Sequence, residues 1–458
     1  MTTGTTVVEA GNLIGGVQSP ARSGRTFESR NPAHAQDVVG VFPRSEAADV
    51  DDAVAAAQAA LREWRGTPWP ARGEIILRAA ELLAGHKEEL ARLMTREMGK
   101  VLVEAGGDVQ EAIDMGVFIA GEGRRAFGET VPSELRHKWA MTMRQPFGVV
   151  GCITPWNFPI AIPSWKVFPA LMAGNTVVLK PAEDSPMCAL RFAELLEAAG
   201  LPAGVLNVVF GYGEEAGDAL VKHPDVKAIF FTGGVETGRV VAEACGRLLK
   251  KCSLELGGKN AIVVLADSDL ELAVDGALWG AFGTAGQRCT ATSRLIVERP
   301  VLGSFTERLL SRTAALRLGD GLENGVDVGP VINEAQLGRV HEYTRIGVAE
   351  GAHRAIGGEI ARDGALAEGW FYTPTVFTDV RPAMRIAQEE IFGPTTAVLA
   401  VDSLDEALDV ANSTRYGLSL SVYTNDLRRA FRAIDELESG IVYVNAPTSG
   451  AEIQLPFG

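Results

Sequence analysis

Between Gly148 and Leu256 the chain repeats a unit of short apolar segment, loop and helix, and this repeat limits the possible folds most strongly. The apolar segments predict strands over Val149–Ile153, Thr176–Leu179, Leu206–Phe210, Ala228–Phe231 and Cys252–Leu256. Helices are expected between them, for example over Ala189–Ala199 and Glu236–Ala244. Apolar strands that alternate with helices form a parallel sheet whose two faces are both covered. The repeat therefore predicts a doubly wound, Rossmann-like domain of the dinucleotide-binding type.

A second α/β series follows Lys259. Helices are expected over Leu270–Phe282 and Val301–Leu316, and strands over Arg294–Glu298, Ala397–Val401, Leu418–Tyr423 and Ile441–Asn445. Because 458 residues are too many for one ordinary hydrophobic core, two large domains are expected. The predicted fold class is α/β, with two doubly wound domains.

The segment Gly128–Pro146 interrupts the helical region that precedes the first sheet. Trp139, Met141 and Met143 alternate there with Ala140, Thr142 and Arg144, which is the period of a strand with one covered face. The segment predicts a β-hairpin. The alternation does not decide whether this hairpin packs on its own domain as an ordinary edge hairpin.

Charge and cysteine content exclude several kinds of partner. The formal net charge of −15 argues against nucleic acids and anionic membranes, which both require a basic surface. No apolar run is long enough to span a membrane. The five cysteines contain no CxxC pair, so a reduced, cytoplasmic chain is expected. The six histidines form no HxxxH or HExxH pattern, so no metal site is expected.

Cys289 lies in the segment Gly286-Gln287-Arg288-Cys289-Thr290. The arginine before it favours the thiolate, which is the nucleophilic form, and the surrounding small residues let a substrate approach closely. A lone cysteine is more often a small buried hydrophobe than a nucleophile. The interpretation of Cys289 therefore depends on motifs elsewhere in the chain.

Six motifs occur in an order and spacing that resemble those of the aldehyde dehydrogenase superfamily, over nearly the whole chain. They are Pro155-Trp156-Asn157-Phe158-Pro159, Lys180-Pro181-Ala182-Glu183, Glu255-Leu256-Gly257-Gly258-Lys259, the Cys289 segment, Glu389-Glu390-Ile391-Phe392-Gly393-Pro394 and Tyr416-Gly417-Leu418-Ser419.

The resemblance implies a domain layout. An NAD-binding domain would comprise residues 1–127 and 147–256, an oligomerisation hairpin residues 128–146, and a catalytic domain residues 257–446. Residues 447–458 would form a return segment. Family members typically continue beyond the point where this chain stops, so the family's C-terminal tail is expected to be absent. A homo-oligomer, either a dimer or a tetramer, is expected as well.

The resemblance also implies the catalytic residues. Cys289 would be the nucleophile, adding to an aldehyde to form a thiohemiacetal and then a thioester. Asn157 would stabilise the oxyanion together with the backbone N–H of Cys289, although an asparagine between two prolines is also common in turns. Glu255 would activate the water that hydrolyses the thioester, whereas its ordinary interpretation is an exposed charge at a strand end.

NAD is the expected cofactor, with NADP possible. A carboxylate at Glu183 can accept bonds from both ribose hydroxyls and repel a 2′-phosphate, while Lys180 could move to meet one. Gly233 and Gly234 open a helix that can bind a diphosphate, although the family commonly has Ser at position 234. The residues that the resemblance assigns to the cofactor are Ile153, Thr154, Pro155, Trp156, Lys180, Ala182, Glu183, Gly213, Phe231, Thr232, Gly233, Gly234, Thr237, Leu256, Gly257, Glu390 and Phe392.

The substrate is the least constrained feature. Arg288 with Ser449, Gly450 and Ala451 resembles the carboxylate anchor of semialdehyde dehydrogenases, with α-ketoglutaric or α-aminoadipic semialdehyde as leading candidates. Arg288 could instead pair with a nearby acid, which would leave a broad aliphatic or aromatic aldehyde specificity. Two rival functions are a coenzyme A-acylating semialdehyde dehydrogenase, which usually lacks a glutamate at the position of Glu255, and a catalytically silent binding protein of the same fold.

Replacing Cys289 by Ser is predicted to abolish turnover and to leave NAD binding nearly intact, because the thiol acts on the aldehyde carbon. The measurement is NADH formation at saturating substrate beside NAD titration. Serine at Cys152, Cys188, Cys245 or Cys252 is the matched control and should leave the rate largely unchanged. More than a few per cent of the wild-type rate in Cys289→Ser would remove Cys289 from this role.

Overall fold

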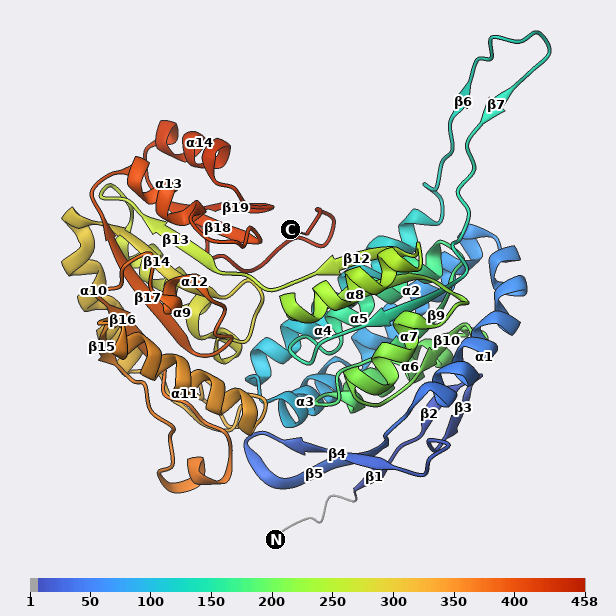
Figure 1. Ribbon diagram of the computed structural model, residues 1–458, viewed down its shortest axis with the longest axis horizontal. Helices are drawn as coiled ribbons and strands as arrows, with labels where there is room; N and C mark the ends of the chain where they lie inside the picture. Colours follow the sequence, from blue (N-terminus) through green and yellow to red (C-terminus); the bar gives the residue numbers. More distant parts are fainter. Residues whose placement is uncertain (1–6, 458) are drawn as a thin grey trace. The chain divides into compact units, whose positions relative to one another are not determined.

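The computed structural model describes residues 7–457, so residues 1–6 and Gly458, the last residue of the expected return segment, lie outside it. The described chain forms two compact units (Figure 1). The first comprises residues 7–30, Val38–Glu97 and Ala105–Glu255, and the second comprises Asn31–Asp37, Met98–Glu104 and residues 256–457.

Two short segments of the expected first domain therefore group with the second unit. Asn31–Asp37 is held by the bond from the Trp370 N–H to the Pro32 carbonyl, 2.9 Å long. Met98–Glu104 is held by bonds such as that from the Leu102 N–H to the Gly321 carbonyl, at 3.1 Å. Contacts between residues so distant in the sequence leave no local pattern, which is why these segments differ from the expected layout.

A mixed sheet forms the centre of the first unit, in the order β12-β11-β8-β9-β10-β2-β3. The strands β8 to β12 are parallel to one another, while β2 joins β10 in the antiparallel sense. Their bounds are β2 Asn12–Ile14, β3 Val17–Ser19, β8 Val149–Ile153, β9 Thr176–Lys180, β10 Leu206–Val208, β11 Val226–Thr232 and β12 Lys251–Glu255. The predicted parallel sheet is confirmed.

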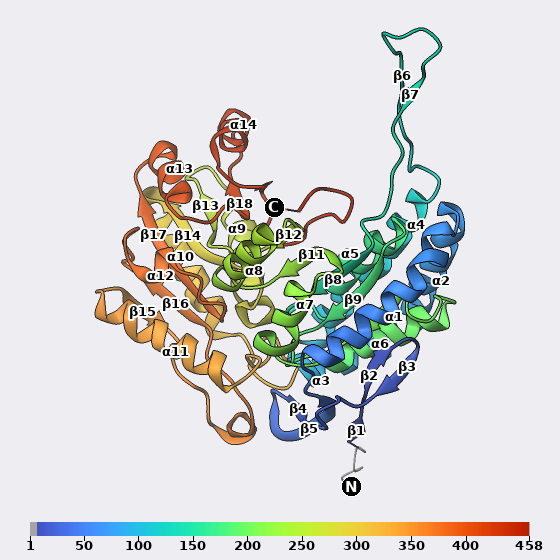
Figure 2. The ribbon, with the colours of Figure 1, turned by 45° about the vertical axis from the view of Figure 1, so that its right-hand side comes forward.

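Helices cover both faces of this sheet (Figures 1 and 2). On one face, α5 and α6 pack against the strands, and α2 packs against both of these helices. On the other face, α1 contacts α7, and α7 contacts α8. The helices of this part of the chain are α1 Ala47–Gly66, α2 Trp69–Gly85, α3 Lys87–Met98, α4 Leu102–Glu122, α5 Ala161–Met172, α6 Pro186–Ala198, α7 Asp218–Lys222 and α8 Val235–Arg247. A one-turn π-helix, Gly213–Gly217, precedes α7, and β1 Val8–Glu9, β4 Thr26–Asn31 and β5 His34–Pro43 form a small separate sheet.

The predicted hairpin exists and projects from the body of the first unit (Figures 1 and 2). Its paired strands are β6 Thr130–Val131 and β7 Ala140–Met141. The alternation predicted one covered face, but Trp139, Met141 and Met143 are 80%, 63% and 73% exposed in this single chain. A covered face is therefore absent within residues 7–457.

The second unit contains a sheet in the order β15-β16-β17-β14-β13-β18-β19, parallel except for β15. Its strands are β13 Asn260–Val264, β14 Thr292–Glu298, β15 His353–Ile356, β16 Thr375–Thr378, β17 Thr395–Val401, β18 Ser419–Tyr423 and β19 Ile441–Val444. The contacting pair α9 Leu270–Phe282 and α10 Arg299–Ala314 packs on the sheet, as does the contacting pair α13 Leu404–Asn412 and α14 Leu427–Glu436. The remaining helices are α11 Glu334–Ala349, α12 Arg385–Gln388 and the 3-10 turns Gly283–Gly286 and Gly364–Glu368.

Two general features follow from these elements. Fully buried strands paired in parallel and covered by helices confirm the predicted α/β class in both units. Of the helices described between residues 7 and 457, none is both long and apolar enough to cross a membrane.

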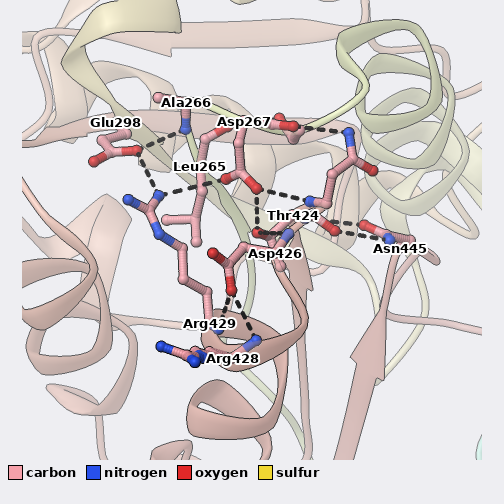
Figure 3. A network of polar contacts seen from close by, with 11 residues as sticks. Leu265, Ala266, Asp267, Glu298, Thr424, Asp426, Arg428, Arg429 and Asn445 are labelled. Atoms are coloured by element: carbon pink, nitrogen blue, oxygen red, sulfur yellow. Dashed lines mark hydrogen bonds and ion pairs between the residues drawn. The ribbon is translucent and has the colours of Figure 1, made fainter.

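A polar network fixes the ends of β13, β18 and β19 in the second unit (Figure 3). The Asp267 carboxylate accepts bonds from the Thr424 hydroxyl at 2.8 Å and the Asn425 N–H at 2.9 Å, and pairs with Arg429. Thr424 and Asn445 exchange two further bonds, which hold Asn445 in the left-handed region at φ 53°. Burial opposes ionisation of Asp267, but these hydrogen bonds and Arg429 outweigh it, so the pKa of the carboxyl is lowered.

Asp267→Ala is predicted to lower the free energy of unfolding by about 1–3 kcal/mol, because it leaves the buried Thr424 hydroxyl and a backbone N–H without their acceptor. Urea denaturation at neutral pH measures the effect. Asp435→Ala, on the exposed side of α14, is the control and should change stability by less than about 0.5 kcal/mol. Equal effects of the two substitutions would contradict a structural role for the Asp267 network.

Candidate active site

The carboxyl ends of the parallel strands bring predicted cofactor residues together along one edge of the first sheet. Ile153 is the register partner of both Lys180 and Phe231, and Thr232 is the partner of Glu255. β8 lies between β9 and β11, so the helices that follow β8 and β11 leave the sheet on opposite faces. Ligands of open α/β sheets bind outside the carboxyl ends of strands at such a point.

The start of α8 fits a diphosphate. The Gly233 N–H donates to the Glu255 carbonyl at 3.1 Å, and Gly234 is the N-cap, where no side chain caps the helix. A Cβ on Gly234 would meet open space, so the helix N-terminus is open to an anion. Thr237 lies in the first turn, and Gly213 begins the π-helix that precedes α7.

Lys180 and Glu183 form an ion pair just beyond the end of β9, with Nζ 3.0 Å from Oε2. The Lys180 side chain is buried, and the Glu183 carboxylate remains about a third exposed. Thr154 lies beside them, because its N–H donates to the Lys180 carbonyl at 3.2 Å. Ala182 is buried between the two charged residues in the sequence. Glu183 can therefore accept hydrogen bonds from ribose hydroxyls while it remains paired with Lys180.

Asn157 lies in the loop between β8 and α5 and is almost fully buried. Pro155 and Trp156, just before it, are half-buried. The loop is fixed at its far end, where the Asp108 carboxylate accepts the Ala161 N–H at 2.7 Å. Burial of the side chain distinguishes Asn157 from an ordinary solvent-exposed turn asparagine.

Glu255 ends β12 and is half-buried, so burial raises the pKa of its carboxyl, while the Lys166 ammonium partly offsets that rise. Burial in turn lowers the pKa of Lys166, on α5. Lys166 was missed in the sequence, although it is the single charged residue within Ala161–Met172. A lone charge in an apolar helix is a usable signal, because burying it unpaired is costly.

Cys289 follows a turn in the second unit and is partly exposed. The Asn260 side-chain amide donates to the Cys289 carbonyl at 2.7 Å and to the Ala291 carbonyl at 3.0 Å. Gly258 packs against the same carbonyl, since a Cβ there would lie 2.5 Å from the oxygen. The backbone at Cys289 is thus fixed from β13, whose role the sequence did not reveal.

Glu390 and Gly257, both assigned to the cofactor, lie together in the second unit. Glu390 Oε1 accepts the Gly258 N–H at 3.1 Å, and a Cβ on Gly257 would lie 2.1 Å from the carboxylate. Burial raises the pKa of Glu390, and this N–H partly offsets the rise. Leu256 precedes Gly257 at the start of the longest segment of this unit, and Phe392 has φ 62°, which turns the chain sharply after Glu390.

Arg288 adopts the alternative that the sequence left open, because it pairs with an acid. Its Nη2 lies 3.0 Å from Oε1 of Glu104, and its guanidinium stacks 4.7 Å above the Trp279 ring. Glu104 was not singled out in the sequence, since it lies 184 residues from Arg288.

The expected substrate loop lies beside the Cys289 segment. The Thr448 hydroxyl donates to the Thr290 carbonyl at 2.7 Å. Ser449 follows, and its buried hydroxyl has no hydrogen-bond partner among residues 7–457. Gly450 takes φ 105°, a conformation suited to glycine, and Ala451 is half-buried. An unsatisfied buried hydroxyl here is a candidate contact for a substrate oxygen.

Known proteins resemble this chain over nearly its full length. A family described as the aldehyde dehydrogenase family matches residues 19–458. The α-ketoglutaric semialdehyde dehydrogenase of Bacillus subtilis is 42% identical, over 98% of this chain and 92% of that protein. A phenylacetaldehyde dehydrogenase of Pseudomonas fluorescens is 43% identical, over 97% of this chain and 90% of that protein.

Solved structures share the fold. The betaine aldehyde dehydrogenase of Staphylococcus aureus in complex with NAD+ superimposes with a TM-score of 0.96 at 34% identity, covering 98% of this chain and 90% of that one. An NADP-dependent enzyme of Escherichia coli gives a TM-score of 0.95 at 39% identity, with 98% and 92% covered.

Proposed function

The chain belongs to the aldehyde dehydrogenase family, and from this premise we propose that it oxidises an aldehyde to the carboxylic acid with NAD. The observation that carries the proposal is the strand register of the first unit. It places Glu255, the open N-terminus of α8 and the Lys180–Glu183 pair at neighbouring strand ends. These groups match a base, a diphosphate site and a ribose site.

Each residue has a role in this reaction. The Cys289 thiolate adds to the carbonyl carbon, and the Asn157 amide and the Cys289 backbone N–H donate to the alkoxide that forms. NAD supplies the hydride acceptor when it is bound. Loss of hydride leaves a thioester on Cys289. Glu255 takes a proton from water, which attacks the thioester and releases the acid with the free thiol.

Two features support NAD and hydrolysis over their alternatives. Glu183 can accept bonds from ribose hydroxyls and repels a 2′-phosphate, while Lys180 is already paired with it. The relatives include NADP-dependent enzymes, so NADP is the alternative cofactor. Glu255, half-buried beside Lys166, favours hydrolysis over acyl transfer to coenzyme A. These same catalytic groups argue against a silent binding protein.

For the substrate we propose a semialdehyde that carries a distal carboxylate. Semialdehyde dehydrogenases from Bacillus subtilis and Haloferax volcanii are 42% and 43% identical to the chain. The unpartnered Ser449 hydroxyl beside the Cys289 segment supplies a donor for such a carboxylate. The second candidate substrate is an uncharged aldehyde. The Arg288–Glu104 pair favours this substrate, because Glu104 already compensates the charge of Arg288.

We further propose that the chain is a cytoplasmic homo-oligomer assembled through the β6–β7 hairpin. The hairpin exposes the large apolar side chains Trp139, Met141 and Met143, which an isolated soluble chain rarely presents together. A second copy of the chain would cover them. None of the five cysteines, which all lie within residues 7–457, forms a disulfide bond, as is expected in a reducing compartment.

Glu255→Gln is predicted to give a burst of NADH approaching one equivalent per active site, followed by a slow steady state. The amide cannot activate water, but thiol addition and hydride loss do not need it. Stopped-flow absorbance gives the burst, and mass spectrometry detects the acyl-enzyme. Loss of the burst together with the steady state would place Glu255 before hydride transfer.

Lys166→Met is predicted to shift the acidic limb of the kcat profile to higher pH. Glu255 must be ionised to act, its pKa is raised by burial, and the Lys166 ammonium lowers that pKa. Removing the ammonium therefore raises the pKa further, so activity is lost at a higher pH as the pH falls. Lys222→Met, exposed on α7, is the control. An unmoved acidic limb would exclude this coupling.

A distal carboxylate is predicted to raise kcat/KM about ten- to a hundredfold, since a charge-assisted hydrogen bond contributes about 1.5–3 kcal/mol. The comparison is α-ketoglutaric semialdehyde against pentanal, its uncharged five-carbon counterpart. Ser449→Ala should reduce that ratio and leave pentanal nearly unaffected in KM. A wild-type preference for pentanal would instead support the uncharged-aldehyde candidate.

A further inference from the structure

The turn that leads into Cys289 is strained in the direction that L-residues avoid. Thr284 and Ala285 have φ/ψ of 53°/33° and 52°/36°, and Gly286 follows with φ 68°. Left-handed conformations are ordinary for glycine but unfavourable for residues with a Cβ, and here two such residues adopt them in succession. Strain of this kind persists only where the surrounding structure enforces it.

Glu104, in the first turn of α4, provides that constraint. Its carboxylate accepts the Thr284 N–H with both oxygens at 2.9 Å, and the Thr284 hydroxyl donates to Oε2 at 3.2 Å. The side chain is only 3% exposed, so these bonds do not compete with water. A carboxylate at a helix N-terminus is also stabilised by the helix dipole.

Arg288 closes the arrangement into a ring. Its Nη2 donates to Glu104 Oε1 at 3.0 Å, and its Nε donates to the Thr284 hydroxyl at 3.0 Å. A Cβ on Gly283 would lie 3.0 Å from both the guanidinium and the carboxylate, so a side chain there would require these groups to move by a few tenths of an ångström. Glu104, Thr284 and Arg288 therefore fix both ends of the turn immediately before Cys289.

We propose that Glu104 is a positioning residue that holds the Thr284–Gly286 turn and thereby sets the orientation of Cys289. Asn260 fixes the carbonyl on the other side of the cysteine, at 2.7 Å. Without the acceptor from Glu104, the buried Thr284 N–H is unsatisfied and the turn relaxes towards ordinary φ values. The Cys289 thiol and N–H then lose their orientation.

A simpler role for Glu104 is to compensate the charge of Arg288, and the experiment separates the two. In an Arg288→Leu background no charge needs compensation, so Glu104→Gln and Glu104→Met are compared there. The two side chains are similar in size, but only Gln offers an oxygen to the Thr284 N–H. The readouts are the melting temperature, kcat, KM for NAD and the alkylation rate of the Cys289 peptide by iodoacetamide.

Glu104→Gln in this background should match Arg288→Leu alone in kcat and alkylation. Glu104→Met should lower both about a hundredfold, the scale of loss for a reacting group displaced by about 1 Å, with KM for NAD unchanged. Equal kcat and equal alkylation in the Gln and Met variants would overturn the proposal. If the Met variant does not fold, Glu104→Asp, whose carboxylate is set back by one methylene, replaces it with a loss of at least tenfold expected and the same overturning result.

The effect on turnover rests on the proposed role of Cys289, but alkylation does not. If no variant, including the parent, oxidises aldehydes, the proposed function fails while alkylation still tests Glu104. Asp114→Asn, exposed on the same helix, is the matched control and should leave every readout at the parent value. A comparable loss in that variant would attribute the effect to general damage to α4 and overturn the proposal.

Discussion

The register of the parallel strands in the first unit is the constraint on which the candidate chemistry depends. Ile153 aligns with Lys180 on one side and with Phe231 on the other, and Thr232 aligns with Glu255. A shift of one residue in any of these pairs would turn the affected side chains to the other face of the sheet. Burial prevents such a shift, because β8 and β9 are buried along their whole length. A Cβ at Gly151 would approach Ile229 to 2.8 Å, so β8 and β11 also interlock closely.

The elements that the sequence predicted well are those whose signal is local. The helix Leu270–Phe282 and the strand Val149–Ile153 have the predicted bounds, because apolar periodicity determines both. The strand β13, Asn260–Val264, was missed, since it follows the Gly257-Gly258 turn without a helix between β12 and itself. The hairpin was also predicted from a local pattern, and it exists. The face that the alternation predicted to be covered is nevertheless exposed within residues 7–457 of a single chain.

The sequence predicted the motifs of the candidate site but not the distant residues that contact them. Family resemblance pointed to Cys289, Glu255 and Glu390, whose neighbours in the sequence carry the likeness. Lys166 and Glu104 were missed because each acts on a residue far away in the sequence, and no spacing rule connects them. The role of Arg288 was left between a substrate anchor and an ion pair for the same reason. The structure decides between these roles, because Arg288 pairs with Glu104, which lies 184 positions away in the sequence.

Buried charges lie beside the candidate site as well as elsewhere in the molecule, for example at Arg72 and Glu97. Surface pairs such as Lys222–Asp218 are well solvated and contribute little to stability. Arg288–Glu104 is buried, and a buried pair costs desolvation that its attraction only partly offsets. Lys259 is fully buried beside Gly258, and burial lowers its pKa to about 7. Because apolar groups of similar size often stabilise a protein as well as a buried pair does, the buried charges beside Cys289 and Glu390 are candidates for a role in the site.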